Sequence, residues 1–154
     1  MQLFKNVFSF TLSFVGTGEA IPYAFSAHPE DLRKYSPLEP VVYNIVQTNV
    51  GGAYDATTSS FTCPVHGVYL FSASVLSDMD RQARVALHRN SEHLFNSRAD
   101  AMQGENSASN SIVIECFAGD RIWVESPVES DILPWRNALF SGVLIHEFAN
   151  DGLQ

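Results

Sequence analysis

Cysteines, histidines and loop carboxylates are the side chains in this sequence that could do chemistry. The two cysteines, Cys63 and Cys116, each end an expected strand just before a turn. In an up-and-down ordering of strands those two ends lie at the same pole of a β-sandwich. A disulfide there would close a loop of about 54 residues and contribute at most about 4 kcal/mol in the chain-entropy model. We predict a Cys63–Cys116 disulfide, and two buried free thiols are the alternative.

The histidines do not form a pattern typical of a metalloenzyme. His88 and His93 would lie on adjoining strands joined by a turn, where their rings could approach each other. A zinc site needs further ligands and groups that orient them. The chain also has no H-x-H, no H-E-x-x-H, no G-x-S-x-G and no phosphate-binding glycine-rich loop. We therefore predict that the protein is not an enzyme and requires no cofactor.

Acidic side chains in the expected loops make calcium the metal to consider. Carboxylate oxygens in loops suit calcium, but their spacing resembles no known calcium-binding loop. Calcium therefore stays a candidate, and no ligand is assigned to it. The loop acids are Asp78, Asp80, Glu105, Asp120, Glu129 and Asp131.

Length and composition indicate one folded domain. The chain has 154 residues, and 45% of them are hydrophobic, which is enough for a proper core. The formal net charge of −8 argues against binding to nucleic acid or to an anionic membrane, since both favour a basic face. No apolar stretch reaches the roughly 18 residues that a transmembrane helix needs, so we expect no membrane insertion.

Residues 1–20 have the pattern of a secretory signal peptide. Lys5 precedes an apolar stretch at 7–15, and residues 18–20 place small side chains at a cleavage site. This pattern predicts a secreted, extracellular protein. The alternative is a strand, because residues 8–14 alternate Phe or Leu with Ser or Thr.

The rest of the chain is typical of an all-β sandwich. Short apolar runs rich in Val, Ile, Phe and Tyr alternate with polar, glycine or proline clusters, and long helical periodicity is missing. The segment 28–40 contains three prolines and is expected to be a surface connection. We expect strands near 23–28, 41–49, 54–62, 67–77, 82–89, 93–98, 109–117, 121–126 and 138–147. The turn residues between them predict turns at 64–67, 78–80, 90–91, 104–107, 119–120 and 127–134.

Two of these strands are apolar on both faces. Along 67–77, Tyr69 and Phe71 alternate with Val68 and Leu70. The strand expected at 138–147 repeats the pattern, with one face formed by Ala138, Phe140, Gly142 and Leu144 and the other by Leu139, Val143 and Ile145. A sandwich core covers only one face of each sheet, so a second copy of the chain is expected to cover the other. A long loop over that face is the alternative.

One run of aromatic and glycine residues resembles the signature of the C1q domain, the globular head of complement C1q and of many binding proteins. The matching positions are Tyr43, Asn49, Tyr54, Phe61, Gly67, Tyr69, Phe71 and Ala73. Tyr43 stands where Phe is usual, and Ala73 replaces an aromatic residue. Segment 23–27 resembles the first strand of that family, and segments 119–124 and 140–145 resemble its last two strands, so the resemblance covers about 23–148.

The resemblance implies a jelly-roll β-sandwich of two antiparallel sheets with about ten strands, assembled as a homotrimer. It places a C1q-like globular domain at 21–148, between the signal peptide and a polar tail at 149–154. We assign six residues to the interface between copies, namely Tyr43, Tyr69, Phe71, Phe140, Gly142 and Leu144.

The expected function is recognition by a stalkless head, since no Gly-x-y collagen repeat precedes the domain. Such heads resemble lectin-like pattern-recognition proteins of innate immunity that bind microbial polysaccharides or glycans. The alternative is a trimeric ligand for a protein receptor, as in the adipokine, cerebellin or tumour-necrosis-factor branches. Loops 78–81, 90–93, 99–108 and 127–137 are the candidate binding surfaces. The candidate ligand-binding residues are Asp78, Asp80, Arg81, Trp135 and Arg136.

Overall fold

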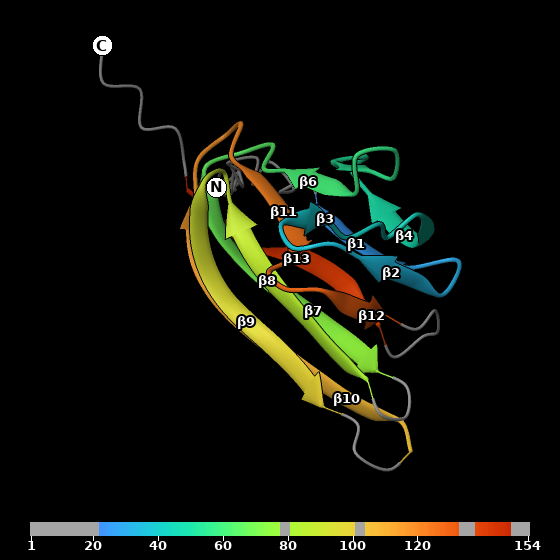
Figure 1. Ribbon diagram of the computed structural model, residues 1–154. Helices are drawn as coiled ribbons and strands as arrows, with labels where there is room; N and C mark the ends of the chain where they lie inside the picture. The colour runs from blue at the N-terminus through green and yellow to red at the C-terminus, as the bar shows by residue number, and fades with distance from the viewer. Residues whose placement is uncertain (1–21, 78–80, 101–103, 133–137, 149–154) are drawn as a thin grey trace, which may run out of the picture.

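The protein is a sandwich of two antiparallel β-sheets (Figure 1). A computed structural model describes residues 22–77, 81–100, 104–132 and 138–148. Within these ranges the chain forms thirteen strands and no helix, and so no helix there is long and apolar enough to span a membrane. The predicted all-β jelly-roll sandwich is confirmed.

The first sheet has five strands in the order β10-β7-β13-β1-β4. Their bounds are β1 (Ala24–His28), β4 (Ile45–Val50), β7 (Gly67–Ser77), β10 (Asn106–Cys116) and β13 (Phe140–Glu147). Its central row places Phe71 of β7 opposite Gly142 of β13, which in turn lies opposite Phe25 of β1. Strands far apart in the sequence are therefore neighbours, as a jelly roll requires.

The second sheet has six strands, and β8 lies between β9 and β11. Their bounds are β3 (Glu39–Pro40), β5 (Tyr54–Asp55), β6 (Ser60–Thr62), β8 (Gln82–Arg89), β9 (Glu92–Asp100) and β11 (Arg121–Ser126). The inward residues of β8 and β11 are apolar and buried, whereas the outward ones are mostly polar. That alternation is the period-2 pattern of a half-buried strand.

Three short strands depart from the predicted pattern. The segment 28–40 is more than a surface connection, because β2 (Arg33–Tyr35) pairs with β12 (Ser130–Ile132) inside the predicted 127–134 turn, and β3 adds to β11. The expected strand 54–62 is divided by a turn, where Asp55 Oδ1 accepts a hydrogen bond of 2.8 Å from the backbone N–H of Thr57. Such short pairs carry too little periodicity to be recognised from sequence.

Aromatic rings fill the space between the sheets. The Phe25 ring stacks on Tyr54 at 4.5 Å between centroids and on Phe61 at 4.9 Å, and Phe140 meets its edge at 4.8 Å. Offset stacks and edge contacts at these distances are the favoured arrangements of aromatic pairs. These rings hold one protomer together without help from another copy.

Gly142 makes that packing possible. A Cβ atom built on Gly142 would lie 2.5 Å from Phe71 Cδ1 and 2.6 Å from Phe25 Cε1. Real side chains do not approach so closely, so a larger residue would have to displace both rings.

The residues assigned to the trimer interface lie instead on the inner face of the five-stranded sheet. Four of them are fully buried inside a single chain, Gly142 packs between two rings, and Leu144 is half-buried against the core. A side chain enclosed by its own protomer cannot touch a second copy. This corrects the assignment for Tyr43, Tyr69, Phe71, Phe140 and Gly142, whereas the assignment of Leu144 stays a prediction.

The outer face of the five-stranded sheet carries the second apolar row. Leu70 lies opposite Val113 on one side and Val143 on the other, and Ala24 lies between Val143 and Val50. Val113 is 57% exposed, Val50 44% and Val143 38%. Aliphatic side chains in one continuous row across a sheet mark an interaction surface.

Candidate functional site

Two tight turns meet at one pole of the sandwich and form the candidate site. The turn between β8 and β9 consists of Asn90 and Ser91, and Asn90 has φ of 52°. Two-residue hairpins favour Asn where φ is positive. The turn between β10 and β11 places Gly119 at φ of 93°. Each turn thus contains a residue type suited to left-handed backbone.

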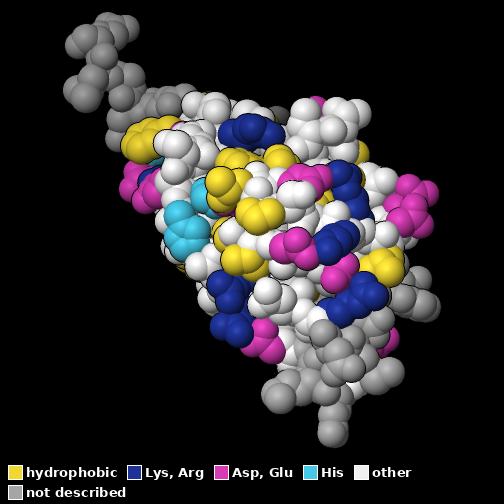
Figure 2. Space-filling view, viewed as in Figure 1, with side chains coloured by type: hydrophobic (Ala, Val, Ile, Leu, Met, Phe, Trp, Pro, Cys, Tyr) yellow, Lys and Arg dark blue, Asp and Glu magenta, His cyan; other side chains and the backbone are white. Residues whose placement is uncertain are grey.

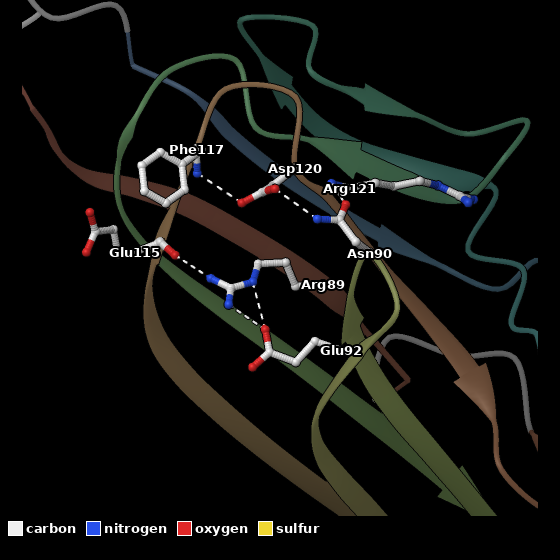
Figure 3. Close-up of polar contacts among 7 residues, drawn as sticks. All are labelled: Arg89, Asn90, Glu92, Glu115, Phe117, Asp120 and Arg121. Atoms are coloured by element: carbon white, nitrogen blue, oxygen red, sulfur yellow. Dashed lines mark hydrogen bonds and ion pairs between the residues drawn. The ribbon is translucent and has the colours of Figure 1, made fainter.

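Arg89, at the end of β8, links three strands at this pole (Figure 3). Its Nε donates to Glu92 Oε2 at 3.0 Å, and its Nη1 donates to the backbone carbonyl of Glu115 at 2.7 Å. The hydrogen bond with Glu92 is also the main cause that raises the pKa of Arg89. Arg89 is therefore a permanent cation that positions the ends of β8, β9 and β10.

Asp120 and Asn90 connect the two turns. Asp120 Oδ2 accepts a hydrogen bond from the backbone N–H of Phe117 at 3.0 Å, and its Oδ1 accepts one from Asn90 Nδ2 at 2.9 Å (Figure 3). Asn90 Oδ1 in turn accepts from the backbone N–H of Arg121 at 2.9 Å. Both side chains are thus held in one orientation before any ligand arrives.

These residues surround an open hollow of about 290 Å³. It is lined by Arg89, Asn90, Ser91, Glu92, Phe117 and Asp120. The Phe117 ring is 57% exposed and stacks on the His66 ring at 4.4 Å with an angle of 12° between the planes. His66 Nε2 lies 2.7 Å from Glu115 Oε1, which fixes the imidazole beneath the phenyl ring. The hollow therefore presents one apolar ring beside several hydrogen-bonding groups.

Comparison with known proteins establishes the family. The C1q domain family model matches residues 24–145. This chain is a C1q domain. It is 34% identical over 112 residues to Protein HP-25 homolog 1 of Bos taurus, covering 71% of this chain and 52% of that protein. It is 31% identical over 86 residues to Complement C1q tumor necrosis factor-related protein 3 of Homo sapiens, covering 54% of this chain and 35% of that protein.

A solved structure confirms the fold of this C1q domain. The globular domain of the zebrafish complement 1qA protein superposes with a TM-score of 0.67 at 22% identity, covering 82% of this chain and 98% of that one. The chain spans about half the length of the bovine relative and about a third of the human one. Members of this family are generally non-enzymatic modules that form trimers and bind receptors or other ligands.

The two cysteines of this C1q domain lie next to each other beneath the hollow. Both are buried, are free thiols in this structure and interact by a hydrogen bond. The Cys63 N–H donates to the Asp120 carbonyl, and the Gly119 N–H donates to the Cys63 carbonyl, each at 2.8 Å. The hydrogen bond with Cys116, and then burial, raises the pKa of the Cys63 thiol. The thiol pair therefore lies directly behind the turn that carries Phe117 and Asp120.

Oxidation is expected to join Cys63 to Cys116. Incubation with oxidised glutathione should remove two hydrogen atoms from the protein while the glutathione disulfide is reduced to two thiols. The closed loop should raise the free energy of unfolding by up to about 4 kcal/mol. Intact mass and thermal unfolding measure both effects, and Cys63→Ser is the control that cannot form the bond. If both thiols still react with an alkylating agent after unfolding of the treated protein, the predicted disulfide does not form.

Of the five candidate ligand-binding residues from sequence, the structure describes Arg81 alone. Asp78, Asp80, Trp135 and Arg136 lie outside the described residues. Arg81 precedes β8 at the end opposite Arg89, and its Nη1 lies 3.2 Å from Asp131 Oδ1. Among the described parts of the predicted loops, 90–93 is the one that contributes residues to the hollow.

Two residues of the hollow, Arg89 and Phe117, were not recognised from sequence. Phe117 stands just before the 119–120 turn, and an aromatic residue at the end of a strand beside a turn is the signal that could have drawn attention to it. Arg89 stands just before the 90–91 turn in the same way.

No metal site is evident in the described part of this C1q domain. Among residues 22–77, 81–100, 104–132 and 138–148, no group of three or more His, Cys, Asp or Glu side chains is placed to hold an ion. Glu105, Asp120, Glu129 and Asp131 lie in this part, whereas Asp78 and Asp80 lie outside it. Calcium stays a candidate ion, and the described residues provide no ligand set for it.

Proposed function

We propose that this protein is a secreted, trimeric C1q-type recognition module that binds sugars of microbial surfaces or other glycans through the hollow at its pole. The observation that carries this proposal is the exposed Phe117 ring beside a preorganised set of polar groups. Secretion would follow removal of residues 1–20 as a signal peptide.

The chemistry of the hollow suits a neutral sugar. A sugar ring has an apolar face that can pack on Phe117, and its hydroxyl groups both donate and accept hydrogen bonds. Glu92 and Asp120 offer acceptors, while Asn90 and Ser91 offer donors and acceptors. Because Arg89 and Asp120 already hold their neighbours in place, little ordering is needed on binding. The aromatic ring supplies apolar contact area, and the polar groups fix the orientation of the ligand, as in other ligand sites.

Trimer formation would combine three weak sugar-binding sites in one particle. The apolar row on the outer face of the five-stranded sheet is the surface that we propose to be buried between three copies. Three hollows in one rigid particle would then bind a repetitive surface with an avidity well above the affinity of a single site. A protein receptor is the competing partner, because family members bind receptors or other ligands.

Phe117→Ala is expected to weaken binding to glycans about tenfold or more, since truncation of an interface hot spot costs at least about 2 kcal/mol. Binding of the full-length protein to bacterial envelopes and to mannosylated and sialylated glycans measures the effect, with and without EDTA. A loss of glycan binding on addition of EDTA would support a role for calcium in that binding.

Leu32→Ala is the matched control, because Leu32 is an exposed apolar residue, 49% accessible, that does not line the hollow. Its binding should equal that of the wild type. An intact trimer that binds no member of the panel would refute the glycan proposal and favour a protein receptor. Unchanged binding by Phe117→Ala would remove the hollow as the site.

A further inference from the structure

The outward face of the six-stranded sheet begins at the edge of the hollow, where the Arg121 N–H bonds to Asn90, and extends along β8 and β9. Three of its outward side chains are arginines, one on each of three adjacent strands: Arg84 on β8, Arg98 on β9 and Arg121 on β11. Figure 2 shows Lys or Arg and His side chains interspersed with Asp and Glu side chains on the side of the molecule where Figure 1 places β8 and β9. Asp100 on β9 and Glu125 on β11 lie on the same outward face.

Arg84 and Arg98 lie directly opposite each other in the β8–β9 pair. Like charges at directly opposed positions destabilise a sheet. Arg98 Nε lies 2.6 Å from Asp100 Oδ2, whereas Arg84 has no ion pair within the described residues. The Nε–H of Arg84 is buried and finds no acceptor in that same part of the chain. A buried donor without an acceptor is costly, and a ligand from outside the chain cannot reach this buried Nε–H. An external anion would, however, relieve the repulsion between the two opposed guanidinium groups.

Rings occupy the next part of the same face. His88 lies opposite His93 with ring centroids 5.5 Å apart, and it stacks on Trp123 at 4.9 Å. The Trp123 indole N–H donates to the carbonyl of Asn90, in the β8–β9 turn, at 2.9 Å, which fixes the orientation of the ring. His93 is exposed, while Trp123 and His88 are half-buried. These rings form a flat, partly open platform.

Arg121, the first residue of β11, extends this face toward the end where β11 begins. Its guanidinium carbon lies 5.6 Å from the Trp123 ring centroid, and no carboxylate within the described residues pairs with it. The acid in the middle of the face is Glu125, whose Oε1 lies 3.2 Å from His88 Nε2. Arg121 lies beside Asn90, the turn residue that follows β8. Asn90 is six residues from Arg84, or about 20 Å along the strand at roughly 3.3 Å per residue. The face therefore spaces cationic groups along a path longer than one small ligand.

We propose that this face binds an acidic polysaccharide, whose carboxylate or sulfate groups contact Arg84, Arg98 and Arg121 while a sugar ring packs against His93 and Trp123. Guanidinium groups match the geometry of such anions through paired N–H donors. The surface is separate from the apolar row, which lies on the other sheet, so trimer formation through that row would leave it open. It is also independent of whether the pole hollow binds a sugar.

Chondroitin sulfate is the probe, with dextran as the neutral polymer of matched length. The full-length protein should bind chondroitin sulfate with an affinity that falls as salt increases. The double variant Arg98→Gln/Arg121→Gln should weaken that binding about tenfold or more, because hydrogen bonds to charged groups are lost. Arg33→Gln removes an exposed charge that belongs to none of the strands β8, β9 and β11, and it should bind as the wild type does.

Four results would overturn the proposal. One is unchanged binding by the double variant at wild-type thermal stability, and another is equal binding of dextran. The third is equal binding of single-stranded DNA with the same sensitivity to the variants, which would indicate a general polyanion surface. Phe117→Ala should leave chondroitin sulfate binding intact. Loss of binding in that variant would be the fourth, because it would assign the ligand to the hollow.

Discussion

Replacing Phe140 with alanine is expected to lower the free energy of unfolding by about 3–5 kcal/mol. Phe140 is fully buried, meets the edge of Phe25 at 4.8 Å and packs against Tyr43 at 5.7 Å. Truncation loses the burial of the ring and leaves a cavity between two sheets that cannot collapse around it. A loss of this size is a large fraction of the 5–15 kcal/mol that stabilises a typical domain. Chemical denaturation followed by tryptophan fluorescence measures it.

Val113→Ala is the matched control for the core position. Val113 is an apolar residue on the outer face of the five-stranded sheet and is 57% exposed in one chain. It should change the stability of a protomer much less than Phe140→Ala does. If Phe140→Ala dissociated the assembly and left the unfolding free energy of the protomer unchanged, Phe140 would belong to an interface rather than to the core.

Val143→Asp is expected to convert the trimer to single chains of 17.0 kDa. Val143 lies in the middle of the apolar row, between Ala24 and Leu70. Burying an unpaired carboxylate between copies would cost about 3–5 kcal/mol, and symmetry would bring three of them together. Sedimentation velocity at micromolar concentration measures the change in mass.

Asn96→Asp is the control for added charge. Asn96 is exposed on β9, in the outer face of the other sheet. This variant should keep the mass of the wild type. A Val143→Asp protein that still sediments as a trimer would show that a different surface of the C1q domain holds the copies together.

Local patterns in the sequence predicted much of the sheet structure. The strands at 67–77, 82–89 and 121–126 have the predicted bounds because each alternates side chains with period 2 and is bounded by turn residues. The 90–91 and 119–120 turns were predicted for the same kind of reason, since Asn and Gly tolerate positive φ. The aromatic spacing from Tyr43 to Phe71 also identified the family, which the matched region 24–145 confirms.

The candidate site could be predicted only in part. The sequence predicted 90–93 as a binding loop, but it did not predict that this loop lies beside Phe117 and Asp120. Asn90 and Asp120 are 30 residues apart in sequence, and His66 and Glu115 are 49 apart. Local sequence preferences cannot predict such contacts, because these depend on which strands become neighbours in the fold. The same holds for the opposition of Arg84 and Arg98 across β8 and β9.

By itself, the sequence determined the strand pattern, the turn chemistry, the family and the existence of two apolar faces on the five-stranded sheet. Only the tertiary structure decided which of those faces is the core. Strand β7 is apolar on both sides, with Tyr69 and Phe71 on one and Val68 and Leu70 on the other. The period-2 pattern is the same for both sides, so it cannot tell which side faces the core. The choice follows from packing: the rings fit against Phe25 and around Gly142 between the sheets, where a smaller aliphatic row would leave voids.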